Sequence, residues 1–201
     1  MVETEVLDTT EAGLRRAASL LRAGRLVAFP TETVYGLGAR WDDEGAVERL
    51  RRVKDRPEGK PFAALIASPE DASRYARLGP GAAALAERFW PGPLTLVLPG
   101  GSGGEVGLRC PDCRVTRRLV ALTGCPVAAP SANPSGEPPA LSAEEVLRVF
   151  QGRITAVVDG GPAALGRAST VVRLRGDEVE ILREGALPPS EVRAVARDAA
   201  R

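Results

Sequence analysis

A short loop over residues 29–38 holds an unusual density of groups that form hydrogen bonds. It carries two threonines, a glutamate and a tyrosine between a proline and two glycines, directly after a short apolar run. A surface turn needs glycine or proline but not this many polar tips, and glycine allows another molecule to approach the backbone. The loop therefore predicts a binding site for a small polar molecule; the alternative is an ordinary connection between a strand and a helix.

A second candidate is the charged segment that begins at Lys54 and runs through Arg56 and Pro57. Because the residue before a proline is disfavoured in a helix, we expect the helix over residues 43–53 to end near Lys54. In the extended chain that follows, Lys54 and Arg56 would point to the same side. Two cations on one side of a rigid loop suit a carboxylate or phosphates, whereas the alternative is a solvated run of charges.

Two further polar clusters follow expected strands or flank them. Ser131 and Asn133 come directly after the apolar run 126–129, and Ser169 and Thr170 open a strand pair that closes at Arg183. In α/β proteins, loops that converge on one rim of the sheet form the ligand site. We therefore expect the loop Thr31–Tyr35, the two cations and these two clusters to meet there.

The cysteines allow a different interpretation. Cys110 and Cys113 form a CxxC motif between an expected strand and an expected helix, which is the placement of a thioredoxin-like redox pair. The third cysteine, Cys125, has no such partner, and with three cysteines and no histidine a four-ligand zinc site would need an additional acidic ligand. The simpler interpretation, which we favour, is three thiols without a chemical role in a reducing compartment.

The composition excludes several classes of function. The chain has 201 residues, no histidine and a net charge of +1, so histidine general bases, Ser-His-Asp triads and a general attraction to nucleic acid are excluded. Aromatic residues make up 4%, which disfavours a base-stacking surface. No apolar run is long enough to span a membrane and the N-terminus is not a signal peptide, so we expect a cytoplasmic protein.

The elements that must position these residues alternate between helices and strands. The fold class predicted from this pattern is α/β, a single domain with a twisted mixed parallel and antiparallel sheet and flanking helices. The expected helices begin near residues 8, 43, 68, 82, 115, 142 and 190, and the expected strands span residues 26–29, 62–67, 94–98, 105–109, 126–129, 154–158, 169–174 and 179–183.

Taken together and in this order, the motifs resemble the YrdC family, the threonylcarbamoyl-AMP synthases. The resemblance covers nearly the whole chain. One departure is Cys113, near which family members often carry histidine. The matching pieces are Pro30-Thr-Glu-Thr-Val-Tyr-Gly-Leu-Gly38, Lys54-x-Arg56-Pro57, Trp90-Pro-Gly-Pro-Leu-Thr95, Arg109-x-Pro111, Ala129-Pro-Ser-Ala-Asn-Pro-Ser-Gly136, Ser169-Thr-Val-Val172 and Leu182-Arg-x-Gly185.

The resemblance implies a YrdC-like fold related to the DHBP-synthase fold, in the single-domain form, with residues 1–201 as one domain and a core over about residues 8–190. It implies a nucleotidyltransferase that converts L-threonine, bicarbonate or CO2, and ATP to threonylcarbamoyl-AMP and pyrophosphate. This would be the first step of the threonylcarbamoyladenosine modification of tRNA. The product would pass to the tRNA threonylcarbamoyl-transferase complex, with a contact to tRNA itself left open.

The resemblance also implies roles for single residues. Mg²⁺ would arrive with the ATP phosphates, and no residue is assigned to a metal. Lys54 and Arg56 would be the catalytic cations and would hold the threonine carboxylate and nearby phosphates. Threonine would further contact Thr33 and Ser169, and the nucleotide would contact Thr31, Tyr35, Arg56, Arg109, Ser131, Asn133 and Arg183.

Three other functions compete with this one. A module that binds double-stranded RNA or tRNA could use the basic run from Arg49 to Lys54 together with Arg56, although the net charge and the few aromatic residues argue against it. A thiol oxidoreductase would use Cys110 and Cys113. A relative that handles another carbamoyl adenylate would normally lie within a much longer chain.

Overall fold

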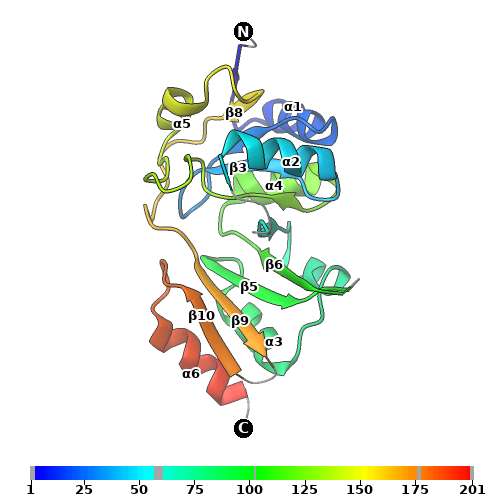
Figure 1. Ribbon diagram of the computed structural model, residues 1–201, viewed down its shortest axis with the longest axis vertical. Helices are drawn as coiled ribbons and strands as arrows, with labels where there is room; N and C mark the ends of the chain where they lie inside the picture. The colour runs from blue at the N-terminus through cyan, green and yellow to red at the C-terminus, as the bar shows by residue number, and fades with distance from the viewer. Residues whose placement is uncertain (1–2, 57–60, 102, 176–177, 200–201) are drawn as a thin grey trace.

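The computed structural model describes residues 3–56, 61–101, 103–175 and 178–199. Figure 1 shows an elongated molecule with β1 and α6 at opposite ends. The strands are β1 Glu5–Leu7, β2 Val27–Phe29, β3 Gly36–Arg40, β4 Ala64–Leu65, β5 Leu94–Pro99, β6 Glu105–Arg109, β7 Val127–Ala128, β8 Ala156–Val158, β9 Thr170–Arg175 and β10 Glu178–Arg183. The helices are α1 Glu11–Arg22, α2 Glu44–Val53, α3 Pro80–Phe89, α4 Arg114–Thr123, α5 Ala143–Phe150 and α6 Pro189–Ala199, with a 3₁₀ helix over Pro69–Arg74.

One sheet joins these strands in the order β1-β8-β2-β3-β7-β4-β6-β5-β9-β10. The sheet contains parallel pairs, such as β5 with β9, as well as antiparallel pairs, such as β2 with β3 and β9 with β10. The predicted fold class, α/β with a mixed sheet and flanking helices, is therefore confirmed. No helix in the described ranges is long and apolar enough to cross a membrane.

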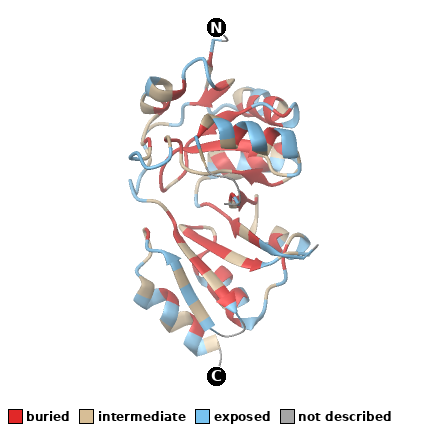
Figure 2. Cartoon of the chain, viewed as in Figure 1, coloured by how far each residue is buried: buried red, intermediate tan, exposed pale blue. Residues whose placement is uncertain are grey.

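Helices cover both faces of the sheet near β2 and β8. Val27 and Phe29 belong to the core beneath α1 and α4, whereas Ala28 belongs to the core beneath α2 and α5. Successive side chains of a strand point to opposite faces, so a strand covered on both sides is apolar throughout. Figure 2 accordingly shows buried residues along these strands and exposed ones on the outer side of α2.

The strands β5, β6 and β9 are covered by helices on one face, by α3 and α6. Leu94, Leu96 and Leu98 pack into that core, together with Leu108 and Val172. The residues between them alternate to the other face of the sheet. This face forms the floor of the cavity described below.

Local signals in the sequence account for most element ends. Ser142 caps α5 as expected, by accepting a hydrogen bond from the Glu145 amide at 3.2 Å. At α1, which was expected to begin near residue 8, Thr10 is the cap and accepts from the Gly13 amide, so the helix begins at Glu11. Asp8 instead accepts from the Thr10 amide and so orders the turn before the helix.

The expected strand over residues 62–67 is shorter in the structure. Its flanks pair through single backbone hydrogen bonds, Ala129 N to Ala63 O at 3.0 Å and Ile66 N to Arg109 O at 2.9 Å. These bonds keep the chain extended. The regular ladder covers only Ala64–Leu65, because β4 pairs with each of its neighbours, β6 and β7, over these two residues alone.

Candidate active site

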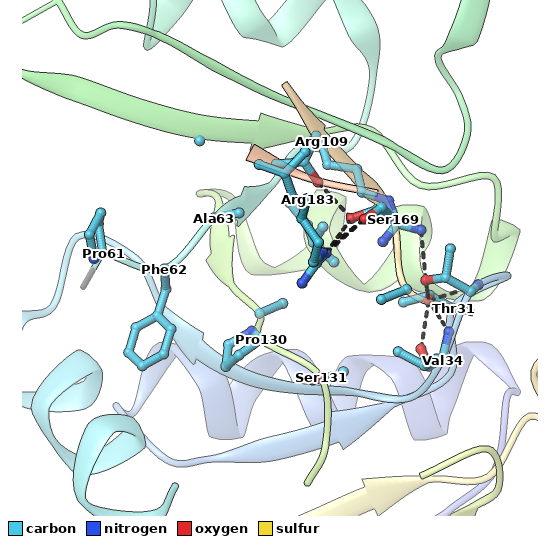
Figure 3. A pocket seen from close by; sticks show the side chains of 18 of the residues that line it. Thr31, Val34, Pro61, Phe62, Ala63, Arg109, Pro130, Ser131, Ser169 and Arg183 are labelled. Atoms are coloured by element: carbon cyan, nitrogen blue, oxygen red, sulfur yellow. Dashed lines mark hydrogen bonds between the residues drawn. The ribbon is translucent and has the colours of Figure 1, made fainter. Parts of the chain in front are cut away.

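A cavity of about 1000 Å³ lies beside the uncovered face of β5, β6 and β9. Six separate segments bring the sequence-predicted site residues to its wall, and Figure 3 shows Arg109, Arg183 and Ser169 on one side, with Thr31 and Ser131 across from them. All ten line it: Thr31, Thr33, Tyr35, Lys54, Arg56, Arg109, Ser131, Asn133, Ser169 and Arg183. The four polar clusters therefore converge as expected, except for Thr170, which is buried away from the cavity and donates its hydroxyl hydrogen to Leu187 O at 2.7 Å. The role of each residue toward a ligand stays a prediction.

The loop after β2 is held by its own threonines. The Thr31 hydroxyl donates to Val34 O at 2.6 Å and accepts from the amides of Thr33 and Val34. Because a hydroxyl has one proton, the Thr33 hydroxyl must be the donor in its 2.8 Å contact with Thr31 Oγ1. The loop is thus fixed before any ligand arrives.

Tyr35 ties this loop to the segment after β8. Its hydroxyl donates to Gly161 O at 2.8 Å and accepts from the Gly160 amide at 3.3 Å. Burial raises the pKa of Tyr35, so it remains a neutral phenol. Tyr35 lines the cavity, and its expected contact with a nucleotide remains a prediction.

Arg109 joins β6 to the same loop through a buried ion pair that the sequence did not assign to the site. Its Nη2 donates to Glu32 Oε1 at 2.7 Å and to Thr33 Oγ1 at 3.0 Å, and its Nε donates to Gly92 O. The side chains of Arg109 and Glu32 are 8% and 12% exposed. The Glu32 carboxylate thus compensates one buried cation, and Arg109 positions Thr33.

Lys54 is a buried cation with no carboxylate among its hydrogen-bond partners in the described residues. It is 3% exposed, and its Nζ donates to the backbone carbonyls of Ser131, at 2.5 Å, and Asn133. Burial, with a smaller effect from Arg56, lowers the pKa of Lys54 to about 8. An ammonium has three donors, so one N–H remains for a ligand.

The reason expected for the placement of Lys54 and Arg56 is wrong. The segment is not extended: Lys54 is in the helical region and Asp55 has a φ of 50°. The Asp55 amide donates to Arg52 O and the Arg56 amide to Arg51 O, which together form a Schellman motif. This turn, formed by the backbone at the end of α2, brings both cations to the cavity. Pro57, on which the expectation depended, lies outside the described residues.

Asn133 follows Ser131 on the loop after β7. The Asn133 amide donates to Pro134 O at 2.7 Å and Glu137 O at 2.8 Å, which fixes its orientation. Its Oδ1 is buried and has no hydrogen-bond partner within the described part of the chain. A buried acceptor without a donor is costly, so a donor from a ligand would stabilise it.

Ser169 and Arg183 form the opposite wall. Arg183 Nη2 donates to Ser169 O at 2.8 Å and to Ser169 Oγ at 3.0 Å, and Ser169 Oγ contacts Thr95 Oγ1 at 2.8 Å. Burial lowers the pKa of Arg183, and the charges of Arg109 and Arg56 add to this effect. Like charges that face one cavity create a site for anions.

Sequence reasoning missed part of the cavity floor. Thr95, Gly107 and Arg173 line it, as do Glu105 and Phe62. The alternation of apolar and other residues in β5 and β6 was the available signal, since Leu94, Leu96 and Leu98 mark the covered face. Phe62 gave no such signal.

The thiol of Cys110 has properties opposite to those of a reactive redox cysteine. Burial raises the pKa of Cys110 to about 12, whereas a reactive thiol needs a lowered pKa and access. Cys113 donates its thiol hydrogen to Pro30 O at 3.7 Å. Within the described residues no group of three or more acidic or cysteine side chains could hold a metal ion.

The Sua5/YciO/YrdC family model, described as "Telomere recombination", matches residues 19–185. The chain belongs to this family. It is 45% identical over 192 residues to a threonylcarbamoyl-AMP synthase of Pyrococcus abyssi, covering 90% of this chain and 56% of that protein. It is 41% identical over 206 residues to a threonylcarbamoyl-AMP synthase of Bacillus subtilis, covering 96% and 59%.

A solved structure gives the same relationship. P. abyssi Sua5 complexed with L-threonine superposes on this chain with a TM-score of 0.91 and 42% identity, over 96% of this chain and 61% of that one. The chain thus spans between 56% and 61% of the length of these three relatives. The fold is therefore shared with this relative.

Proposed function

We propose that this chain is a nucleotidyltransferase that makes threonylcarbamoyl-AMP from L-threonine, bicarbonate or CO2, and ATP, with release of pyrophosphate. The observation that carries the proposal is the convergence of Lys54, Arg56, Arg109 and Arg183 on one cavity that also presents hydroxyl groups. The names of the relatives and the threonine in the Sua5 structure support the choice of substrates.

The proposed reaction has two steps. The amine of threonine attacks CO2 and loses a proton, which gives a carbamate. A carbamate oxygen then attacks the α-phosphorus of ATP, a P–O bond forms, and the bond from the α-phosphorus to pyrophosphate breaks. Nucleotidyl transfer of this kind depends on positioning and on stabilisation of charge rather than on a covalent intermediate with the protein.

The cavity residues suit these tasks. Lys54 and Arg56 would neutralise the threonine carboxylate and the nearby phosphates, with Thr33 and Ser169 as further contacts of threonine. Arg183 would balance charge on the nucleotide side. Magnesium would enter with the phosphates of ATP as part of the substrate and add positive charge there.

The remaining nucleotide contacts proposed are Thr31, Tyr35, Arg109, Ser131 and Asn133. The product, a mixed anhydride, would be passed to a tRNA threonylcarbamoyl-transferase complex for the modification of tRNA. We place the reaction in the cytoplasm, where ATP, bicarbonate and tRNA occur together.

Pyrophosphate release tests the proposal. Purified protein would be incubated with MgATP and bicarbonate, with and without L-threonine, and with L-serine in its place. We expect release only with threonine and bicarbonate together, and weaker release with serine, since one methyl group contributes about 1–3 kcal/mol of discrimination. Release that does not depend on threonine, from folded protein, would overturn the proposal.

The variant Lys54→Ala tests the role of the cavity. We expect it to lose most turnover while keeping the wild-type fold by circular dichroism. Arg52→Ala, which removes an exposed arginine of the same helix with a 70% exposed side chain, is the matched control and should retain activity.

A further inference from the structure

The last strand of the sheet, β10, contains an additional residue next to one of the cavity arginines. Ile181 pairs with Val172 of β9, and Arg183 pairs with Val171, so Leu182 lies between two successive pairs without a partner position of its own. This arrangement is a β-bulge, in which two residues of one strand oppose one residue of its neighbour.

The bulge decides which face of the sheet Arg183 reaches. Before the bulge the side chains of β10 alternate: Glu180 forms an ion pair with the cavity-lining Arg173, and Ile181 packs against the core beneath α3 and α6. A regular strand would continue with Leu182 toward the cavity and Arg183 toward the helices. Because of the additional residue, Leu182 and Arg183 both line the cavity instead.

Thr170, the first residue of β9, holds the chain that follows the bulge. Its side chain is fully buried, and its hydroxyl donates to Leu187 O at 2.7 Å and accepts from the amides of Gly185 and Leu187 at 3.0 Å each. A hydroxyl has one donor and two acceptor positions, so all three are used. A regular ladder would pair Arg183 with Thr170 and shift residues 185–187 by one position, which would break all three bonds.

Gly185 excludes the regular pairing for a second reason. Its backbone lies so close to the residues before β9 that a Cβ atom at this place would overlap the backbone of Ala168 and Ser169. Only glycine fits there, because it has no Cβ atom. Without the bulge, Glu184 would take the place of Gly185. The hydroxyl of Thr170 and this glycine therefore both favour the bulged pairing.

Ser169, the residue before Thr170, receives the side chain that the bulge redirects. Arg183 Nε and Nη2 donate to Ser169 O at 3.1 Å and 2.8 Å, and Figure 3 shows Arg183 and Ser169 together at the cavity wall. We propose that Thr170 and Gly185 are positioning residues, which hold the bulge in β10 that turns Arg183 into the cavity. For its effect on catalysis this inference rests on the proposed function, in which Arg183 serves the nucleotide.

A matched pair of deletions tests the proposal. Deleting Leu182 or deleting Glu184 removes one residue from the same end of β10, and each gives a regular ladder when Thr170 keeps its bonds. In the first variant Arg183 still lies opposite Val171 and faces the cavity. In the second, Leu182 lies opposite Val171 and Arg183 faces the helices. The two variants therefore differ in the direction of the arginine.

The first measurement needs no activity. In isotopically labelled, unliganded protein, nuclear Overhauser effects between backbone protons of β9 and β10 show which residues are paired. We expect Val171 to contact Arg183 in wild type and after deletion of Leu182, and to contact Leu182 after deletion of Glu184. Thr170→Val, which removes all three hydroxyl bonds, should lose the contact between Val171 and Arg183, and Thr170→Ser should keep it.

Thr4→Val is the matched control for the loss of a buried threonine hydroxyl. Thr4 is 6% exposed, and its hydroxyl donates to Ile154 O at 2.8 Å and accepts from the Gly152 amide at 2.9 Å. Thr4 does not line the cavity. We expect this variant to keep the wild-type pairing of β9 with β10.

The second measurement is kinetic. Deletion of Glu184 and Thr170→Val should each lower kcat/KM for threonine-dependent pyrophosphate release by about tenfold to a hundredfold, as expected for the loss of one charged hydrogen-bonding group. Deletion of Leu182 and Thr170→Ser should retain clearly more activity than these two. In an Arg183→Ala background the two deletions should be equally active, since no arginine remains to be turned.

The outcomes separate this inference from the proposed function. Equal activity of the two deletions in the wild-type background, or a contact between Val171 and Arg183 that persists in Thr170→Val, would overturn the role of the bulge. If Thr170→Val does not fold, the two deletions decide. If wild-type protein releases no pyrophosphate, the proposed function fails, and the nuclear Overhauser effects then decide about the bulge alone.

Discussion

Lys54 carries a charge that depends on pH in the neutral range. Because burial depresses its pKa from 10.5 to about 8, the folded protein loses this proton at a lower pH than the unfolded chain. The buried charge therefore costs stability below pH 8, and this cost is relieved as the pH rises from about 8 to 10.5. A bound anion would favour the charged form and raise the pKa again.

We expect binding of MgATP to take up a proton near pH 8, because the anion recharges Lys54. Titration calorimetry in two buffers with different ionisation enthalpies measures this uptake. Binding should weaken as the pH rises further. Lys54→Met should abolish the uptake, and an unchanged uptake in that variant would assign the proton to another group.

Glu32 is expected to matter for stability as much as for the site. Glu32→Gln removes the charge that compensates Arg109 in a buried pair, which should lower the free energy of unfolding by about 3 kcal/mol. Urea denaturation measures the loss. The control Glu144→Gln breaks an exposed pair with Arg148 and should cost under about 0.5 kcal/mol. Equal losses of the free energy of unfolding in the two variants would show that the buried pair contributes no more to stability than the exposed pair.

At the scale of elements, the turn after α2 places Asp55, rather than a glycine, at its left-handed position. Asp55 is exposed and adopts a left-handed conformation, which only glycine reaches without cost. Asp55→Gly should therefore raise the free energy of unfolding by up to about 1 kcal/mol and keep activity, whereas Asp55→Val should lower both. Thermal unfolding and pyrophosphate release test this pair, and a stable, active valine variant would contradict the account of the turn.

The elements themselves were largely predictable, because their signals are local. The apolar run before Pro30 and the capping serine at Ser142 specify a strand and a helix from a few neighbouring residues. The left-handed turn at Asp55 was not predictable from this information, since the bonds that stabilise it form only after α2 is complete. The order of strands also depends on distant pairings, such as Leu94 with Thr170.

At the scale of the whole molecule, one sheet connects the two walls of the cavity. The loops after β2 and β7 supply one wall, and β6, β9 and β10 supply the other, so segments far apart in the sequence line the cavity. The motifs indicated that ten residues would meet, as they do. Glu32 was not assigned to the site because its role comes from a contact across the fold, to Arg109, rather than from its own sequence context.

The most direct measurement is the identity of the product. The protein would be incubated with MgATP, L-threonine and isotopically labelled bicarbonate, and the nucleotide product analysed by mass spectrometry. We expect one product that contains adenylate, threonine and a single labelled carbon, formed together with pyrophosphate. A nucleotide product without threonine or without the label would contradict the account.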